Sequence, residues 1–306
     1  MWSLTTQLQY RSDWPVFSQP RALFLGGNTG SKETVIQFID VTTTGNASDF
    51  GDLTAGRASL MSASSKIRAV AAGGNTGSAV NVIDYVTIAS EGNASDFGDL
   101  SSTSQEGTGT GSSTRGLFQL GLATSNVNTV EYVTIASTGN ATDFGDRTTT
   151  AAYGQDSAVS SPTRGVFSGG FISNSVNIID YVTIASTGDA TDFGDTSVTR
   201  YGMGGASSST RGVFGGGNTS GDTMDYITIA STGNASDFGN LTNSPRYISG
   251  TSNGVRGIFG GGKVSSTRQD VIQYITIAST GNASDFGNLI ASNFSLTATS
   301  GSHGGI

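Results

Sequence analysis

Six copies of one short motif constrain the fold of this chain more than any other feature. The motif reads Gly-Asn-Ala-Ser/Thr-Asp-Phe-Gly-Asp/Asn, and its phenylalanine recurs at intervals of 45 to 49 residues. The six copies place it at Phe50, Phe97, Phe144, Phe193, Phe238 and Phe286. Self-similarity at such a period is typical of a repeat architecture, in which each unit buries its apolar surface against its neighbours.

Two further landmarks recur in fixed order within every copy. An aromatic residue lies twelve positions before each motif phenylalanine, at Phe38, Tyr85, Tyr132, Tyr181, Tyr226 and Tyr274. A short segment of the form Arg-Gly/Ala-Val/Leu/Ile-Phe/Ala comes earlier and begins at Arg21, Arg68, Arg115, Arg164, Arg211 and Arg256. Three ordered landmarks repeated six times define one structural unit per copy.

Each unit contains four short segments with the composition of β-strands. In residues 200–241, a small Gly-rich segment is followed by Arg-Gly-Val-Phe at 211–214 and by Met-Asp-Tyr-Ile-Thr-Ile-Ala at 224–230. The last segment begins at Ser236. β-branched and aromatic residues favour strands, and the intervening Gly, Ser, Thr and Asn residues favour turns. The pattern predicts four antiparallel strands per unit.

The unit resembles the kelch repeat, in which a double glycine follows the second strand of a propeller blade and an aromatic residue lies in the third. The glycine pairs are Gly26-Gly27, Gly73-Gly74, Gly169-Gly170, Gly216-Gly217 and Gly261-Gly262. The third unit has Gln119-Leu120-Gly121 instead, and phenylalanine replaces the usual tryptophan of the fourth strand. The resemblance implies an all-β, six-bladed kelch-like β-propeller over residues 21–306.

Closure of the ring requires a first strand for the first blade. The segment 291–306 follows the sixth motif and places Asn293 to Thr297 where another innermost strand belongs. The alternative is that residues 14–18 form this strand. In the first case residues 1–20, which contain Trp2 and Trp14, are an N-terminal extension and a candidate docking arm.

Charge and composition exclude several functions. The net charge of −8 and the pI near 4.5 argue against nucleic-acid binding and against attraction to an anionic membrane. No cysteine is present, and no apolar run approaches the length of a membrane span. The first residues lack the pattern of a signal peptide. We expect no cofactor, no metal, no membrane insertion and no catalytic activity, since the single histidine, His303, is not repeated and is interpreted as a loop residue.

The repeated polar residues are expected to be structural. The motif clusters oxygen atoms but lacks the carboxylate spacing and late glutamate of a calcium loop, so we interpret it as a turn. The arginine that begins each second strand has an aspartate of the motif in the same repeat. We therefore expect a ring of Arg–Asp contacts, with an anion-binding arginine ring as the alternative.

Comparison of the six repeats separates constant from variable connections. The spacing from arginine to the second glycine, and from the third-strand aromatic to the motif phenylalanine, does not change. The connections between strands two and three, and between strand four and the next blade, vary in length and sequence and emerge at the same end of the blades. We predict that this end binds a partner or ligand, with neutral drift of exposed loops as the alternative. The candidate residues are Asn28, Lys32, Asn75, Thr76, Asn126, Phe171, Asn174, Asn218, Asp222, Lys263 and Arg268.

The near-identical Tyr-Val/Ile-Thr-Ile-Ala-Ser-Thr-Gly-Asn-Ala-Ser/Thr-Asp-Phe-Gly-Asp units are also similar to repeats in structural proteins of marine tailed bacteriophages. This resemblance implies a virion component, such as a tail fibre, tail tip or capsid decoration, assembled in the host cytoplasm. Its partners would be other virion proteins or a host-surface glycan or receptor. The alternatives are a bacterial glycan-binding or adaptor propeller and, less in keeping with the residues, a carbohydrate-active enzyme.

Overall fold

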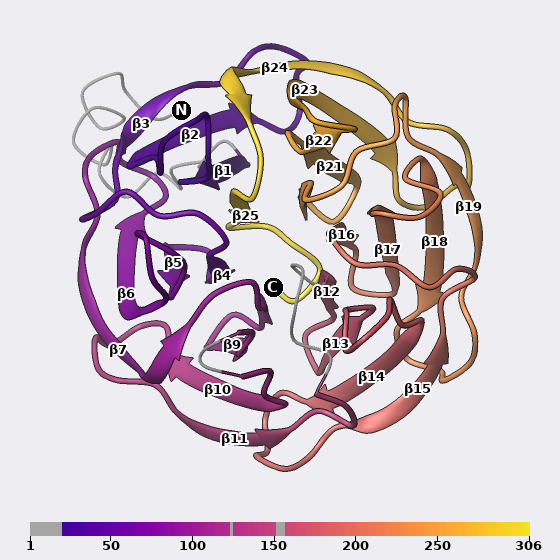
Figure 1. The fold of residues 1–306 in the computed structure, drawn as a ribbon, viewed down its shortest axis with the longest axis horizontal. Helices are drawn as coiled ribbons and strands as arrows, with labels where there is room; N and C mark the ends of the chain where they lie inside the picture. Colours follow the sequence, from indigo (N-terminus) through magenta and orange to yellow (C-terminus); the bar gives the residue numbers. More distant parts are fainter. Residues whose placement is uncertain (1–19, 123–124, 151–156) are drawn as a thin grey trace, which may run out of the picture.

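The structure, a computed structural model, describes residues 20–122, 125–150 and 157–306. Every regular element in this part of the chain is a β-strand. The strands form six antiparallel sheets around a central axis, as Figure 1 shows, and the sixth sheet carries one additional short strand. The prediction of an all-β, six-bladed propeller with four strands per blade is confirmed.

Within each blade the first strand lies nearest the axis and the fourth strand lies at the rim. The first strands are β25 (Thr297–Ser300), β4 (Met61–Ser64), β8 (Thr108–Gly111), β12 (Ser157–Ser160), β16 (Met203–Ser207) and β20 (Ser249–Ser252). The second strands are β1 (Arg21–Leu25), β5 (Arg68–Ala72), β9 (Arg115–Gln119), β13 (Arg164–Ser168), β17 (Arg211–Gly216) and β21 (Arg256–Gly260).

The outer two strands carry the third-strand aromatic and the motif. The third strands are β2 (Val35–Asp40), β6 (Val80–Thr87), β10 (Thr129–Thr134), β14 (Ile178–Thr183), β18 (Thr223–Thr228) and β23 (Thr267–Thr276), with the additional β22 (Lys263–Val264) beside β23. The fourth strands are β3 (Ser48–Asp52), β7 (Ser95–Ser104), β11 (Thr142–Asp146), β15 (Thr191–Asp195), β19 (Ser236–Asn240) and β24 (Ser284–Asn293).

The first blade combines strands from distant parts of the chain. β25 pairs antiparallel with β1, with Thr297 opposite Leu25 and Ser300 opposite Ala22. The inner position of this blade is therefore held by the C-terminal segment. Residues 14–18, the alternative closing strand, and the proposed docking arm with Trp2 and Trp14 lie outside the described residues.

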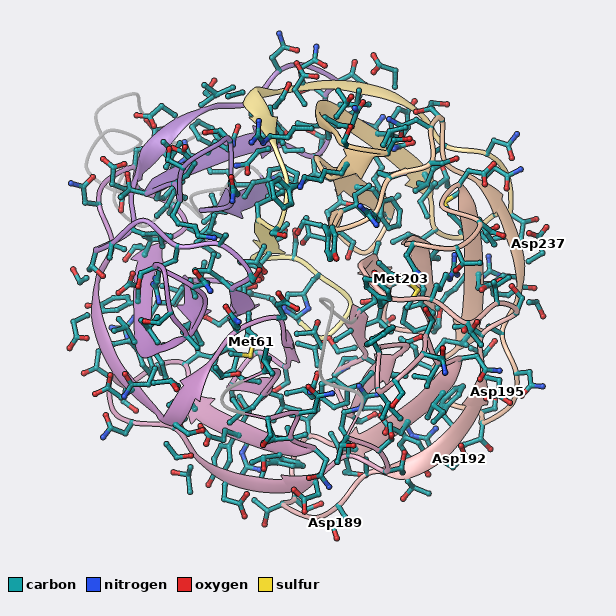
Figure 2. All side chains as sticks on the ribbon, viewed as in Figure 1. Met61, Asp189, Asp192, Asp195, Met203 and Asp237 are labelled. Atoms are coloured by element: carbon teal, nitrogen blue, oxygen red, sulfur yellow. The ribbon has the colours of Figure 1, made fainter. Side chains whose placement is uncertain are left out.

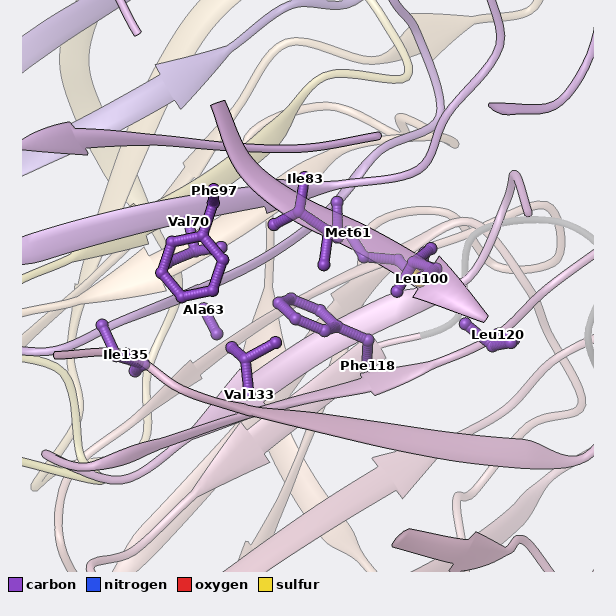
Figure 3. Packing of buried hydrophobic residues seen from close by; sticks show 11 residues of the cluster. Met61, Ala63, Val70, Ile83, Phe97, Leu100, Phe118, Leu120, Val133 and Ile135 are labelled. Atoms are coloured by element: carbon purple, nitrogen blue, oxygen red, sulfur yellow. The ribbon is translucent and has the colours of Figure 1, made fainter. Parts of the chain in front are cut away.

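The hydrophobic core lies between the blades. Figure 3 shows the cluster in which Met61, Phe97 and Leu100 of blade two contact Phe118 and Val133 of blade three. Five similar clusters join the other neighbours. Burying one such side chain contributes about 1.5–3 kcal/mol, so each blade is stabilised on both of its faces.

The middle strands supply apolar residues to two clusters at once. Ile83 of β6 packs towards blade three, whereas Val86 of the same strand and Ile88, just after its end, pack towards blade one. Near the axis the first strands come so close that a Cβ on Gly109 would lie 2.3 Å from the carbonyl oxygen of Ser62. The third strand is therefore apolar on both faces, and the first strands carry small residues where they approach one another near the axis.

The repeated motif joins neighbouring blades at the rim. The backbone N–H groups of Gly92 and Ala94 in blade two donate to the carbonyls of Phe50 and Asp52 in blade one, at 2.8 and 2.7 Å. The N–H of Asp52 donates in return to Asn93 Oδ1 at 3.1 Å. We call these three hydrogen bonds the rim clasp, and it recurs between all six pairs of blades.

The rim clasp explains the composition of the motif. Its asparagine serves only as an acceptor, and Asp189 therefore replaces it in blade four, where it accepts the N–H of Asp146 at 3.0 Å. A Cβ on the motif residue Gly51 would lie 2.3 Å from the carbonyl oxygen of Gly92, so only glycine fits. Figure 2 shows Asp189, Asp192, Asp195 and Asp237 at the outer edge, far from the axis.

The second-strand arginines do not form the predicted pairs with motif aspartates. Each guanidinium lies over the third-strand aromatic of its own blade, with the guanidinium carbon 4.4 to 4.9 Å from the ring centroid. Each also donates to a backbone carbonyl of the next blade, as Arg164 does to Ile229 at 2.9 Å. The arginines are structural, but the partner is a ring and a carbonyl, because the guanidinium is planar and the next carbonyl lies within its reach.

A second set of arginines forms buried ion pairs between blades. Arg57, Arg147 and Arg200 bind a third-strand aspartate of the following blade, at 2.5, 2.9 and 2.6 Å, and all six side chains are essentially buried. The aspartates are Asp84, Asp180 and Asp225. Blades one and six have the neutral Gln37 and Gln273 at the corresponding positions, where each accepts an N–H of the preceding blade. Burial lowers the pKa of Arg57 and Arg200, which the paired aspartate opposes.

Candidate functional site

The strand order gives the propeller two distinct ends. The turns between strands one and two, and between three and four, emerge at one end, which we call the uniform end. The connections between strands two and three, and from strand four to the next blade, emerge at the other, the variable end.

The axis of the propeller has no room for a large ligand. Two small hollows of about 50 and 40 Å³ follow it, lined mainly by Gly, Ser, Ala and Thr of the first strands. At the uniform end the segment 301–306 lies across the axis, where Figure 1 marks the C-terminus. There His303 is partly buried, with Nε2 3.1 Å from the carbonyl oxygen of Ser64, and Nδ1 accepts the N–H of Gly305 at 3.1 Å. Along the part of the axis that the structure describes, hollows of this size hold no more than a few water molecules, so we look for a larger ligand's site at the two ends of the propeller.

Around the axis at the variable end, backbone hydrogen bonds run from blade to blade. In the five blades where the structure describes it, the residue nine positions after the motif phenylalanine has a left-handed backbone, with φ of 58° at Ser59, 63° at Glu106, 74° at Gly202, 57° at Tyr247 and 56° at Ser295. The N–H of Ser59 donates to Ser295, that of Ser295 to Tyr247, and that of Tyr247 to Gly202, at 2.7, 3.2 and 2.8 Å. This strained conformation costs about 1–3 kcal/mol at a residue with a side chain and persists where surrounding contacts fix it.

A second set of backbone pairs surrounds this ring. The connection entering a blade forms a bridge with the connection between its second and third strands, as Ala58 does with Asn75 and Arg246 with Lys263. Asn28 pairs with Phe294 and Gln105 with Leu122 in the same way. The backbone of the variable end is therefore nearly the same in each of these blades, and the side chains differ.

Four aromatic side chains form a continuous row across one half of this end. Phe171 and Tyr201 have ring centroids 5.4 Å apart, Tyr201 and Tyr247 5.9 Å, and Tyr247 and Phe294 6.3 Å. They come from the connections of blades four, five, six and one, and all four are partly exposed. We call them the aromatic row. Burial raises the pKa of Tyr247, and its hydrogen bond with Tyr201 raises it further.

Three cations accompany the aromatic row. The Lys263 ammonium lies 3.5 Å from the ring centroid of Phe294, and the Arg246 guanidinium carbon lies 5.5 Å from that of Tyr247. Arg268 is opposite Lys263 in the β22–β23 hairpin. Burial lowers the pKa of Lys263, and the charges of Arg268 and Arg246 lower it further. Within the residues that the structure describes, none of the three forms an ion pair with a carboxylate.

The other half of the variable end has different chemistry. In blades two and three the bridge positions hold Ala58, Asn75, Gln105 and Leu122, and the left-handed positions hold Ser59 and Glu106. The Asn75 amide donates to Gln105. A sixfold scaffold thus presents an asymmetric surface, aromatic and cationic on one side and small or polar on the other.

The predicted site residues divide between these two halves. Phe171, Lys263 and Arg268 belong to the aromatic and cationic half. Asn218 supports it, because its Oδ1 accepts the N–H of Tyr201 at 2.9 Å. The prediction missed Tyr201, Arg246, Tyr247 and Phe294, although they occupy the eighth or ninth position after a motif phenylalanine and a repeat alignment of those positions would have revealed them.

The remaining predicted residues lie apart from the aromatic row or within turns. Asn28 and Asn75 each accept the N–H of the residue two positions later, at 2.9 Å, which fixes a turn. Asn126 bridges to Leu122 in the polar half, and Lys32 bridges to Asn28. Thr76 and Asn174 are exposed, and the carbonyl of Asp222 accepts the N–H of Leu241.

The uniform end also carries two exposed apolar residues. Ile67 and Val255 are 66% and 65% exposed, where blades three to five have Thr114, Thr163 and Thr210 in the same turn. A hollow of about 350 Å³ lies beside Ile67 and is also lined by Lys66 and Ala136. This is the strongest competing surface outside the variable end.

Few other features of the chain constrain its function. Among the residues that the structure describes, no group of three or more His, Cys, Asp or Glu side chains could hold a metal ion, and no helix is long and apolar enough to cross a membrane. No protein-family model matches the sequence, and no curated protein is significantly similar to it.

Proposed function

We propose that this chain is a non-enzymatic binding propeller that contacts its partner through the variable end. The observation that carries the proposal is the asymmetry of that end: backbone pairs recur from blade to blade, while the side chains they present differ. A site defined by side chains on a rigid scaffold is typical of a recognition surface.

The relationship to kelch repeats is part of the proposal. It is supported by the glycine pairs, whose backbones have positive φ values, 62° at Gly26 and 106° at Gly27 in blade one. A Cβ on Gly26 would lie 2.4 Å from the carbonyl oxygen of Arg57, so the position requires glycine for space as well as for conformation.

The biological setting that we propose is the virion of a tailed bacteriophage, as a tail fibre, tail tip or capsid decoration. Support comes from the near-identity of the repeats and their resemblance to phage structural repeats. In this setting the variable end would contact a host-surface glycan or receptor or another virion protein. Mass spectrometry of purified particles, searched for peptides of this chain, tests the setting; absence from particles would favour a bacterial adaptor.

Exchange of connections tests the use of the variable end. The connection of blade six from Lys263 to Arg268 is replaced by the blade-two segment from Asn75 to Ala79, which is one residue shorter and gives blade six the blade-two spacing between the second glycine and the third-strand tyrosine. We expect the exchanged protein to fold and to lose adhesion to a polysaccharide array or to host cells. As the control, the turn 65–67 at the uniform end is replaced by the blade-three turn 112–114, which should leave adhesion unchanged. Equal adhesion of both variants and the natural chain would contradict the proposal.

A further inference from the structure

Among the described residues, no carboxylate forms an ion pair with the three cations of the variable end. Lys263, Arg246 and Arg268 lie close enough that the two arginines lower the pKa of the lysine, in a chain whose net charge is −8. Like charges at this proximity repel, so the arrangement costs free energy unless an anion joins it. The Nε atom of Arg246 is buried without a hydrogen-bond partner, which leaves a charged donor group incompletely satisfied.

We propose that this cluster and the aromatic row together bind an acidic polysaccharide, with a carboxylate or sulfate group on the cations and a sugar ring against the aromatic side chains. This inference rests on the proposed function, because it assigns a ligand class to the variable end. Guanidinium groups form charge-assisted hydrogen bonds with carboxylate and sulfate oxygens, and Arg246 and Arg268 lie on either side of Lys263.

The aromatic row favours a sugar over a simple anion. Tyrosine side chains offer an apolar ring and a hydroxyl group, and a sugar acid likewise offers an apolar C–H face, hydroxyl groups and a charge on adjacent atoms. Tyr201 and Tyr247 lie between Phe171 and Phe294 in one row, so successive rings along a polymer can each meet an aromatic surface.

The backbone geometry disfavours an acidic peptide as the ligand. Extended peptides commonly bind by adding a strand, which requires unpaired backbone N–H and C=O groups. At this end the N–H and C=O groups of Arg246 and Lys263 are paired with each other, and the N–H of Tyr247 is bonded to Gly202. Recognition must therefore proceed through side chains, which suits a polymer of polar rings.

Titration calorimetry of the full chain against four polymers tests the proposal. Polygalacturonate carries carboxylates, heparin carries sulfates, a galactan is neutral, and polyglutamate is an acidic peptide. We expect the first, the second or both to bind, and binding to weaken strongly from about 0.1 M to about 1 M salt, which shortens the Debye length from about 10 to about 3 Å. Binding to carboxylates or to sulfates alone identifies the anion.

The variant R246Q/K263Q/R268Q removes the three charges, and K66Q removes one cation at the opposite end as the control. The triple variant should keep its melting temperature, because it removes mutual repulsion, and should lose at least about tenfold in affinity. K66Q should bind like the natural chain. Unchanged affinity of the triple variant, equal binding of polyglutamate, or no binding of either acidic polysaccharide would overturn the proposal.

One outcome separates this inference from the proposed function. If galactan binds as tightly as polygalacturonate, and Tyr201→Ala abolishes that binding, the proposal of an anionic ligand is overturned. The variable end is then still the binding surface. Binding that Tyr201→Ala and the triple variant both leave intact would overturn the two together.

Discussion

At the uniform end, the turn between strands three and four makes the same three hydrogen bonds in every blade, whereas at the variable end equivalent positions hold Ser59, Glu106, Gly202, Tyr247 and Ser295. Both ends join blade to blade through backbone groups. They differ in whether a side chain takes part in these hydrogen bonds: the motif asparagine is itself an acceptor in the rim clasp, while the bonds between the left-handed residues run from backbone N–H to backbone C=O. At positions where closure of the ring does not use the side chain, the residue type can differ between blades. Such positions can form a recognition surface.

Loss of a buried ion pair should have the largest effect on stability. Arg57→Met leaves the carboxylate of Asp84 buried without its cation, which we expect to cost about 3–5 kcal/mol and to lower the melting temperature in calorimetry. The double variant Arg57→Asn with Asp84→Gln copies the neutral pair of residues at the blade six–blade one interface, Asn293 and Gln37, and should recover most of the loss. No recovery would contradict the structural equivalence of these interfaces.

Disruption of the rim clasp should lower the free energy of unfolding by less than loss of a buried ion pair, but still measurably. Gly51→Ala forces a Cβ within 2.3 Å of the Gly92 carbonyl oxygen. We expect a loss of roughly 2–3 kcal/mol in the free energy of unfolding, measured by denaturant titration. Gly92→Ala is the control, since its φ of 154° is similar and nothing lies within 4 Å of the added atom. Equal losses for the two variants would mean that the loss of stability comes from the backbone conformation and not from the contact with the Gly92 carbonyl oxygen.

The segment across the axis at the uniform end should make stability depend on pH. Burial lowers the pKa of His303, and Nδ1 must be unprotonated to accept the N–H of Gly305. The unfolded chain therefore binds this proton more readily, and stability should fall as the pH drops below about 6.5, until the lower folded pKa is passed. His303→Gln should reduce the slope of stability against pH in this window; an unchanged slope would contradict the assignment.

Relief of backbone strain at the variable end should have a small effect of opposite sign. Ser59→Gly replaces a residue at φ 58° by the one that blade five already has at this position, Gly202. We expect a change of about 1 kcal/mol or less towards greater stability in thermal unfolding, because glycine adopts this conformation without steric cost. A loss above 1 kcal/mol would show that the serine side chain stabilises the ring.

The fold was predictable because every blade repeats its landmarks. Phe144 lies twelve residues after Tyr132, and in the structure the two rings pack edge to face with their centroids 6.0 Å apart. The partners of the second-strand arginines could not be predicted in this way. Arg164 donates to the carbonyl of Ile229 in the next blade, and because every residue has a carbonyl, no sequence pattern marks the acceptor.

The candidate site was predictable only in part. Phe171 and Lys263 lie in connections whose sequences differ between the repeats, and this difference predicts them as site residues. Tyr201 and Phe294 come from connections 93 residues apart, and only the closure of the ring places them on either side of Tyr247. Their proximity is a property of the propeller as a whole and of no single repeat.

Site-specific labelling tests the central claim most directly, because the natural chain contains no cysteine. Asn218→Cys at the variable end and Thr138→Cys at the uniform end are both exposed, and each accepts a bulky maleimide polymer at a single site. Adhesion to polysaccharide or to host cells is then measured for both. We predict that the label at residue 218 abolishes adhesion and that the label at residue 138 does not; the reverse result would contradict the assignment of the variable end as the binding surface.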